Sequence, residues 1–236
     1  MRLADVSEPA ALALWRAVEA QHVVATMRLV DTRDEQLLLE QLLEGNKPPL
    51  AAGTAHLHYL LATPFRYRSP FGSRFRTPHD PGVLYGAEEQ RTACAELGYW
   101  RWRFLLDSPS LGHLDTTAQT VFRLRVRGLA IDLRRPPLVS RRLEWTDPAH
   151  YGPCQALGSE ARDAGVALVR YESVRDPEHG GCIAVLDPAA ISHPDPVARE
   201  IWYLLVTRER ARWMPGDHGR HAAGWQFEAQ AWGATP

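Results

Sequence analysis

The chain has 236 residues and a formal net charge of −1, and 45% of its residues are hydrophobic and 23% charged. This composition is typical of a folded globular protein and argues against a disordered or fibrous chain. The balanced charge indicates no polyanionic partner, no apolar run reaches the roughly 18 residues that span a bilayer, and the first residues lack a secretory signal. We therefore expect a cytoplasmic protein that binds neither membrane nor nucleic acid directly.

Residues 1–55 are predicted to form a helical extension. Apolar side chains recur at helical spacing after Ser7 and Pro9, at Ala11, Leu12, Trp15 and Val18. A second helix is indicated by a cap at Asp31 or Thr32, by Glu35 and by a stop at Gly45, which bracket the apolar set Leu38, Leu39, Leu42 and Leu43.

Residues 56–236 are predicted to form the main domain. Its first part, residues 64–81, is rich in Arg, Pro, Gly and Ser and is expected to form turns and short extended pieces. A short strand at 82–86 precedes an amphipathic helix over 88–106, whose predicted apolar stripe comprises Ala93, Leu97, Trp100 and Phe104.

The rest of the chain mixes strands and helices. Residues 121–127 alternate as a strand does, with Phe122, Leu124 and Val126 facing inward and the intervening arginines on a solvated face. A helix is predicted between Asp147-Pro148 and Gly165, and strands over 166–171, 181–186 and 201–212. Because these elements lack a regular βαβ alternation, the fold class is predicted to be α+β.

The cysteines, histidines and arginines bear on whether the protein forms disulfides or binds metal or phosphate. Cys94, Cys154 and Cys182 are far apart and odd in number, which predicts reduced, buried thiols. Neither they nor the histidines show metal-ligand spacing, so no metal site is expected. Lys47 is the only lysine, and arginine supplies the other positive charges. Genomic nucleotide bias explains such a ratio, but guanidinium forks also suit phosphate.

Three segments carry candidate site residues, and each segment also has a purely structural explanation. Glu96 borders the apolar stripe of its helix, where a solvated helix-edge glutamate is the alternative. Arginines alternate with aromatic residues in Phe65-Arg66-Tyr67-Arg68, before Gly72-Ser73-Arg74-Phe75, which a basic surface turn would also explain. Ser173 follows Tyr171-Glu172 at the end of a strand, where an ordinary polar turn is the alternative.

The order of these segments resembles the RES domain family. The resemblance rests on Gly-Ser-Arg74-Phe, then Gly-Val-Leu-Tyr85, then Thr-Ala-Cys-Ala-Glu96, then Tyr-Glu-Ser173-Val-Arg. It extends over about residues 60 to 215, and Ser73 replaces the second glycine of the family's motif. The family's members are similar to ADP-ribosyltransferases of the diphtheria-toxin type, with a mainly antiparallel core.

The resemblance implies an enzyme that cleaves the nicotinamide glycosidic bond of NAD, with inorganic phosphate as acceptor. Arg74, Glu96 and Ser173 would then act in catalysis, and Tyr85, together with Tyr67, would bind NAD. A further arginine follows an aromatic residue in the family, and both Arg66, with Tyr67 beside it, and Arg16 of Leu-Trp-Arg fit. Arg66 is favoured because a tyrosine follows it.

The resemblance also implies a toxin restrained by an Xre-type antitoxin. It leaves the oligomeric state open between a dimer and a toxin–antitoxin hetero-oligomer. Two other functions stay open at this stage: a transferase that places ADP-ribose on a protein, and a non-catalytic interaction protein that retains the fold.

Overall fold

The computed structural model describes residues 2–20, 30–216 and 223–233. Within these ranges the strands are β1 (Glu8–Glu19), β2 (Leu84–Ala87), β3 (His113–Asp132), β4 (Leu168–Glu172), β5 (Gly181–Val185), β6 (Ala198–Thr207), β7 (Arg210–Pro215) and β8 (Trp225–Glu228). The helices are α2 (Arg33–Gly45), α3 (Tyr59–Arg66), α4 (Gln90–Leu106), α5 (Arg142–Trp145) and α6 (Gly152–Asp163). Short 3-10 turns occur at Leu3–Val6, Leu138–Arg141, Pro188–Ala190 and Ala229–Trp232.

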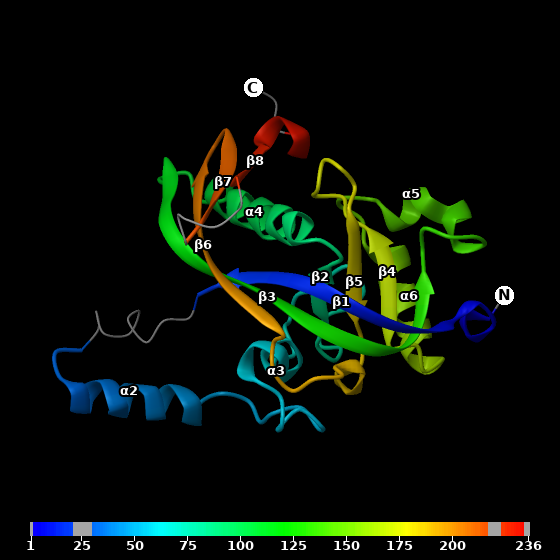
Figure 1. The fold of residues 1–236 in the computed structure, drawn as a ribbon, viewed down its shortest axis with the longest axis horizontal. Helices are drawn as coiled ribbons and strands as arrows, with labels where there is room; N and C mark the ends of the chain where they lie inside the picture. Colours follow the sequence, from blue (N-terminus) through cyan, green and yellow to red (C-terminus); the bar gives the residue numbers. More distant parts are fainter. Residues whose placement is uncertain (1, 21–29, 217–222, 234–236) are drawn as a thin grey trace.

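All of these strands belong to one sheet, in the order β1-β2-β5-β4-β3-β6-β7-β8 (Figure 1). Strand β1 also pairs with β3, so β1, β2, β5, β4 and β3 close into a ring. The other three strands continue the sheet from the first half of β3. Only β3 and β4 pair in parallel among the described strands. The α+β class with a mainly antiparallel sheet is confirmed.

The first predicted helix is wrong, because residues 8–19 form strand β1. This strand pairs with β3 in unbroken register from Glu8 opposite Ala130 to Glu19 opposite Gln119. The segment is apolar at almost every position, so it fits the period of a strand as well as that of a helix. Pairing with the long β3 decides the outcome, and it places β1 in the main sheet rather than in a helical extension ending at residue 55.

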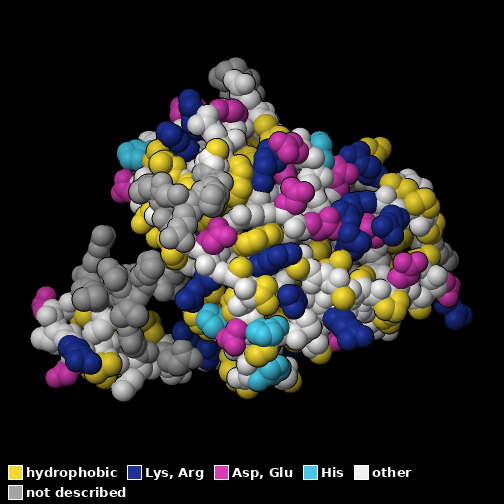
Figure 2. All heavy atoms as spheres, in the orientation of Figure 1, with side chains coloured by type: hydrophobic (Ala, Val, Ile, Leu, Met, Phe, Trp, Pro, Cys, Tyr) yellow, Lys and Arg dark blue, Asp and Glu magenta, His cyan; other side chains and the backbone are white. Residues whose placement is uncertain are grey.

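The second predicted helix is confirmed as α2. Its capping box is complete: the Glu35 amide donates to Thr32 Oγ1 at 3.2 Å, and the Thr32 amide donates to Glu35 Oε2 at 3.1 Å. The helix lies apart from the sheet, and hydrophobic side chains show on it in Figure 2. Its leucine stripe is therefore largely exposed, at Leu37, Leu38, Leu42 and Leu43.

Helix α3 was not predicted. It begins at Tyr59 and is capped by His58, whose Nδ1 accepts from the Leu60 amide at 3.2 Å. Its side chains Leu60, Leu61 and Phe65 pack with Leu14, Phe122, Leu124 and Ile183 of the sheet. The predicted inward positions of β3 are confirmed, because Phe122, Leu124 and Val126 are all buried.

Helix α4 confirms the element predicted over 88–106, but its buried face was predicted only in part: Ala93 is buried and Leu97 is half-buried, whereas the other two residues of the predicted stripe are exposed. Trp100 and Phe104 are 52% and 53% exposed. The buried side is formed by Ala95, Tyr99, Trp102 and Leu105, which pack with Trp202, Leu204, Trp213 and Phe227 of β6, β7 and β8. Apolar residues occur on most sides of this helix, so its sequence does not define a single apolar face. The three strands that cover it decide which side is buried.

The C-terminal strands also correct a prediction. The strand predicted over 201–212 is a hairpin of β6 and β7, with Arg208 and Glu209 between them. Strand β8 was not predicted. Helix α6 and strands β4 and β5 are confirmed, and Gly165 ends the α6 segment at a φ of 71°.

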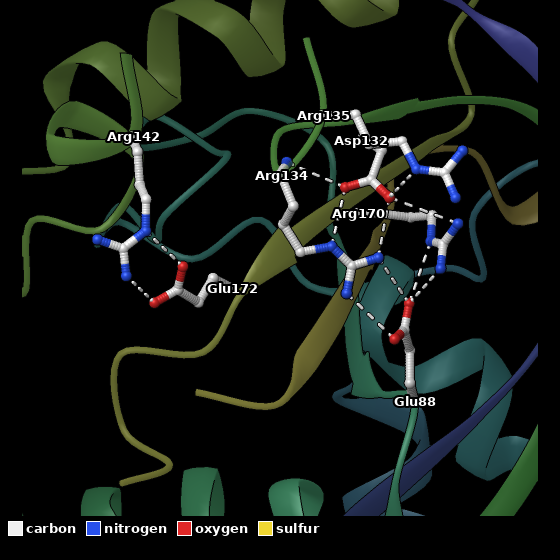
Figure 3. Close-up of polar contacts among 7 residues, drawn as sticks. All are labelled: Glu88, Asp132, Arg134, Arg135, Arg142, Arg170 and Glu172. Atoms are coloured by element: carbon white, nitrogen blue, oxygen red, sulfur yellow. Dashed lines mark hydrogen bonds and ion pairs between the residues drawn. The ribbon is translucent and has the colours of Figure 1, made fainter. Parts of the chain in front are cut away.

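An arginine–carboxylate network joins the ends of β2 and β3 to the middle of β4 (Figure 3). Arg134 donates from Nη2 to Glu88 Oε1 at 3.0 Å and from Nε to Asp132 Oδ1 at 2.8 Å, and Arg170 donates to Glu88 at 2.6 Å. Burial alone would raise the pKa of Glu88, but the hydrogen bonds from the two arginines outweigh it and lower the pKa. Because Glu88 comes just before α4, the network anchors the start of that helix.

No helix in the described ranges has the length and apolar character needed to cross a membrane. No group of three His, Cys, Asp or Glu side chains that could hold a metal occurs in the same ranges. The three cysteines are free and buried, as predicted.

Candidate active site

A cavity of about 320 Å³ opens where β1, β2, α4 and the turn after β4 meet. Its charged lining residues are Arg16, Arg74, Arg175 and Glu96. The described wall of the cavity therefore carries three positive charges and one negative charge. Aromatic rings supply much of the remaining wall, from Trp15, Tyr85, Trp100, Tyr151 and Tyr171.

The structure brings most of the predicted site residues together. Arg74, Tyr85 and Glu96 line the cavity, and Ser173 lies behind Glu96 with its side chain fully buried. Ser173 Oγ donates to Glu96 Oε1 at 2.6 Å. These residues come from a loop, β2, α4 and the turn after β4, so the folded sheet unites them.

The structure places the two arginines that fit the family motif, Arg16 and the favoured Arg66, in different parts of the molecule. Arg16 lines the cavity, whereas Arg66 and Tyr67 do not. Arg66 is the last residue of α3, and its Nε donates to the Pro48 carbonyl outside the cavity. Arg16 reaches the site because residues 8–19 form a strand that runs beside β2.

Glu96 is the carboxylate of the site. Burial raises the pKa of Glu96, and the hydrogen bond from Ser173 and the nearby Arg74 and Arg175 guanidiniums offset only part of this effect. Cys182 Sγ also lies 3.8 Å from Oε1. The carboxylate is thus held at a fixed place in a cationic cavity.

Ser173 positions Glu96 and organises the turn that follows β4. Its Oγ accepts hydrogen bonds from the Arg175 amide at 3.2 Å and from the Asp176 amide at 3.0 Å while it donates to Glu96. The hydroxyl proton is therefore already committed to the carboxylate. This arrangement favours a positioning role for Ser173 over a nucleophilic one.

Arg74 is held by backbone carbonyls. Its Nη1 donates to the carbonyl oxygens of Trp145 at 2.8 Å and Asp147 at 3.1 Å. Its loop is fixed by Tyr85, whose hydroxyl accepts from the Phe75 amide at 3.0 Å and lies 2.8 Å from Ser73 Oγ. Tyr85 thus holds the Arg74 loop through its hydroxyl while its side chain lines the cavity.

Arg16 lies on the β1 side of the cavity. Its Nη1 donates to the Tyr85 carbonyl, and its buried Nε has no hydrogen-bond partner in the described part of the chain. Burial lowers the pKa of Arg16 to about 10, so the guanidinium stays charged at neutral pH. An unpartnered buried N–H is costly, and an anionic ligand would satisfy it.

Arg175, Tyr151, Tyr171 and the two tryptophans were not predicted as site residues. The Arg175 guanidinium lies 3.8 Å from the centroid of the Tyr99 ring, and its Nη2 donates to Tyr151 Oη at 3.2 Å. A signal for Arg175 did exist, since it closes the Tyr-Glu-Ser173-Val-Arg segment. Trp100 had been assigned to the buried stripe, and no local signal marked Tyr151.

The three cavity arginines retain free donors. Among the described residues none of them forms an ion pair, and each donates through only one of its guanidinium nitrogens. Buried positive charge without a partner is unfavourable in a protein interior. The cavity is therefore suited to an anionic ligand with several acceptor oxygens.

Residues 48–207 match the RES domain family, which is more than half of the chain. The chain belongs to the RES domain family. A chain of the crystal structure of the M. tuberculosis MbcT–MbcA toxin–antitoxin complex shares the fold, with a TM-score of 0.50 and 14% identity over 82% of this chain and 85% of that chain. A comparison with curated proteins gives no match.

In this RES domain, parts of the site lie outside the matched residues. Arg16 on β1, which lines the cavity, precedes them, and Trp232, which supports the cavity wall without lining it, follows them. Trp232 Nε1 donates to the Arg175 carbonyl at 2.7 Å, and its ring contacts Tyr99 at a centroid distance of 5.7 Å. The C-terminal segment thus holds the Ser173–Arg175 turn against α4.

Replacing Trp232 by Phe should lower the free energy of unfolding by about 1 kcal/mol, because the aromatic packing persists but the hydrogen bond to Arg175 is lost. Urea unfolding followed by circular dichroism measures this difference. Trp100→Phe is the matched control, since Trp100 is half exposed at the cavity. Equal stability of the two variants would contradict the role assigned to Trp232.

Gly158 lets α6 approach the Arg74 loop. A Cβ at Gly158 would lie 2.4 Å from the Phe75 carbonyl oxygen. Alanine is preferred to glycine in a helix by about 1 kcal/mol, but this clash with backbone should outweigh that gain. We expect Gly158→Ala to lower the melting temperature, whereas Gly152→Ala, with nothing within 4 Å, should not. Thermal unfolding distinguishes them, and an equal or higher melting temperature for Gly158→Ala would refute the close approach.

Proposed function

We propose that this RES domain cleaves NAD at the nicotinamide glycosidic bond and acts as the toxin of a toxin–antitoxin module. One observation carries the proposal: three arginines without ion-pair partners and one partly buried glutamate line the same cavity in the described structure. NAD carries a diphosphate and a cationic nicotinamide ring. Such a ligand requires cations for the phosphates and an anion beside the reacting ribose.

The diphosphate would be held by Arg16 and Arg74. Both guanidiniums are fixed through Nη1 by backbone carbonyls, which leaves their other donors for phosphate oxygens. Charge-assisted, forked hydrogen bonds to phosphate are strong and directional. The unpartnered Nε of Arg16 supports this assignment.

Glu96 would act at the ribose. Its carboxylate accepts hydrogen bonds from ribose hydroxyls and stabilises the positive charge that develops at C1″ as the bond to nicotinamide lengthens. The electron pair of that bond returns to the pyridine nitrogen, so nicotinamide leaves as a neutral molecule. Ser173 keeps the carboxylate in place, and the aromatic side chains of Tyr85 and Trp15 offer faces for the pyridine ring.

The acceptor would be inorganic phosphate, which gives ADP-ribose 1″-phosphate and nicotinamide. The cavity's excess of positive charge supports an anionic acceptor over water or a protein side chain. The partner would be an Xre-type antitoxin that covers the cavity. The structural relative described in a toxin–antitoxin complex supports a partner of this class.

The test is to incubate purified protein with NAD, with and without phosphate, and to follow nicotinamide by chromatography and the nucleotide by ³¹P NMR. We expect nicotinamide and ADP-ribose 1″-phosphate in equal amounts. ADP-ribose as sole product would point to a glycohydrolase, and modified protein in mass spectra to a protein ADP-ribosyltransferase. Unchanged NAD would leave a non-catalytic protein and refute the proposal.

A further inference from the structure

We infer that Arg175 and Tyr151 form a second anion subsite beside Glu96, and that this subsite holds the phosphate that attacks the ribose. The inference rests on the proposed function and adds to it the residues that select the acceptor. It separates the three cavity arginines by role: Arg16 and Arg74 bind the dinucleotide, and Arg175 binds the acceptor.

Tyr151 joins two guanidiniums in one cluster. The Arg74 Cζ lies 4.7 Å from the centroid of the Tyr151 ring, and Arg175 Nη2 donates to Tyr151 Oη at 3.2 Å. Arg175 Nη2 also donates to the Pro148 carbonyl, while its Nε and Nη1 have no partner in the described structure. Arg175 and Tyr151 both line the cavity, so a guanidinium with two uncommitted donors and a phenol hydroxyl lie side by side in its wall, and a phosphate group is bound by donors of this kind.

The cluster lies close to Glu96, the carboxylate proposed to act at the ribose. The Arg175 amide donates to Ser173 Oγ at 3.2 Å, and Ser173 donates to Glu96 at 2.6 Å. Arg74 and Arg175 are the two positive charges that act on Glu96, whereas Arg16 contacts the Tyr85 carbonyl. An anion bound to Arg175 would therefore lie next to the carboxylate of Glu96, which is proposed to act at C1″.

Charge balance favours a second anion. The described wall has three positive charges and one negative charge, which leaves an excess of two. NAD has two negative phosphate charges and one positive pyridinium charge, so it neutralises only one of the two excess positive charges of the wall. A water acceptor would leave a desolvated positive charge unpaired, and an inorganic phosphate would pair with it.

The contacts of Arg175 hold the subsite rigidly enough to direct a phosphate oxygen toward C1″. Arg175 is only 7% exposed, and its guanidinium is stacked on Tyr99, while Trp232 holds its carbonyl. In the reaction, one phosphate oxygen forms a bond to C1″, the bond from C1″ to nicotinamide breaks, and nicotinamide leaves with the electron pair. Fixing the acceptor near the reacting carbon lowers the entropic cost of this step.

The test compares Arg175→Lys and Tyr151→Phe with the wild type in steady-state kinetics, varying inorganic phosphate and NAD separately. We expect KM for phosphate to rise about tenfold or more in Arg175→Lys, because an ammonium cannot reproduce the guanidinium fork, and less in Tyr151→Phe. KM for NAD should change much less, and the product should shift from ADP-ribose 1″-phosphate to ADP-ribose. Arg127→Gln, at an exposed position of β3, is the control for loss of a positive charge.

The outcomes separate the two proposals. If the wild type does not cleave NAD, the proposed function fails. If the wild type makes ADP-ribose 1″-phosphate and both variants keep its KM for phosphate, or lose affinity for NAD and phosphate equally, only the subsite is refuted. If Arg175→Lys does not fold, the wild type and Tyr151→Phe are compared by thermal shift with phosphate alone. Phosphate should then raise the melting temperature of the wild type at least twice as much as that of Tyr151→Phe. Equal shifts would overturn the subsite.

Discussion

Glu96→Gln should nearly abolish NAD cleavage and at the same time raise the melting temperature of the protein. Glutamine is similar in shape and its amide oxygen can still accept the hydrogen bond from Ser173, but it carries no charge to stabilise the cationic transition state. Removing such an electrostatic group costs roughly 10²- to 10³-fold in kcat. Nicotinamide release and differential scanning calorimetry measure the two effects.

The rise in stability follows from the direction of the pKa shift. Burial raises the pKa of Glu96 in the folded protein, so the folded state binds more protons than the unfolded state between the two pKa values. Stability therefore falls as pH increases through this window, and at neutral pH the buried charge is a cost that Gln removes. Each kcal/mol regained corresponds to roughly 2–4 °C in melting temperature.

The same shift sets the acid limb of activity. Because Glu96 must be ionised, kcat/KM should decrease as pH falls through its raised pKa, above the value of an ordinary glutamate. A wild-type profile without such a limb, or a Glu96→Gln variant that retains full activity, would contradict the role assigned to Glu96. A lower melting temperature of that variant would contradict the cost of its burial.

Arg16→Gln should lower kcat/KM for NAD by roughly 10- to 100-fold, whereas Arg66→Gln should change it by less than about twofold. Losing a charge-assisted hydrogen bond to phosphate costs about 1.5–3 kcal/mol, and only Arg16 lines the cavity. The two variants remove the same charge from the two arginines that fitted the family motif. Steady-state kinetics on both variants, with melting temperatures to verify folding, decides between them.

The opposite ranking would mean that the strand position of Arg16 is irrelevant to the substrate and that the dinucleotide binds near α3. An equal loss in both variants would indicate a general effect of charge on association. That effect would disappear at high salt, whereas a direct contact between Arg16 and phosphate inside the cavity would persist.

Several features follow from the sequence by itself because neighbouring residues decide them. The capping box of α2 depends on Thr32 and Glu35, three residues apart. The inward face of β3 depends on a strict alternation of apolar and polar residues. The motifs around Arg74, Glu96 and Ser173 were sufficient to predict the family and two of the cavity's four charged residues, Arg74 and Glu96.

Tertiary structure decided the remaining features, because contacts between residues far apart in the sequence determine them. Residues 8–19 fit two periodicities, and only pairing with β3 makes them a strand and brings Arg16 to the cavity. Helix α4 is apolar on several sides, so the packing of β6, β7 and β8 selects its buried face and leaves Trp100 at the site. Arg175 becomes a site residue through Tyr99, Tyr151 and Trp232, contacts over sequence distances that no local pattern encodes.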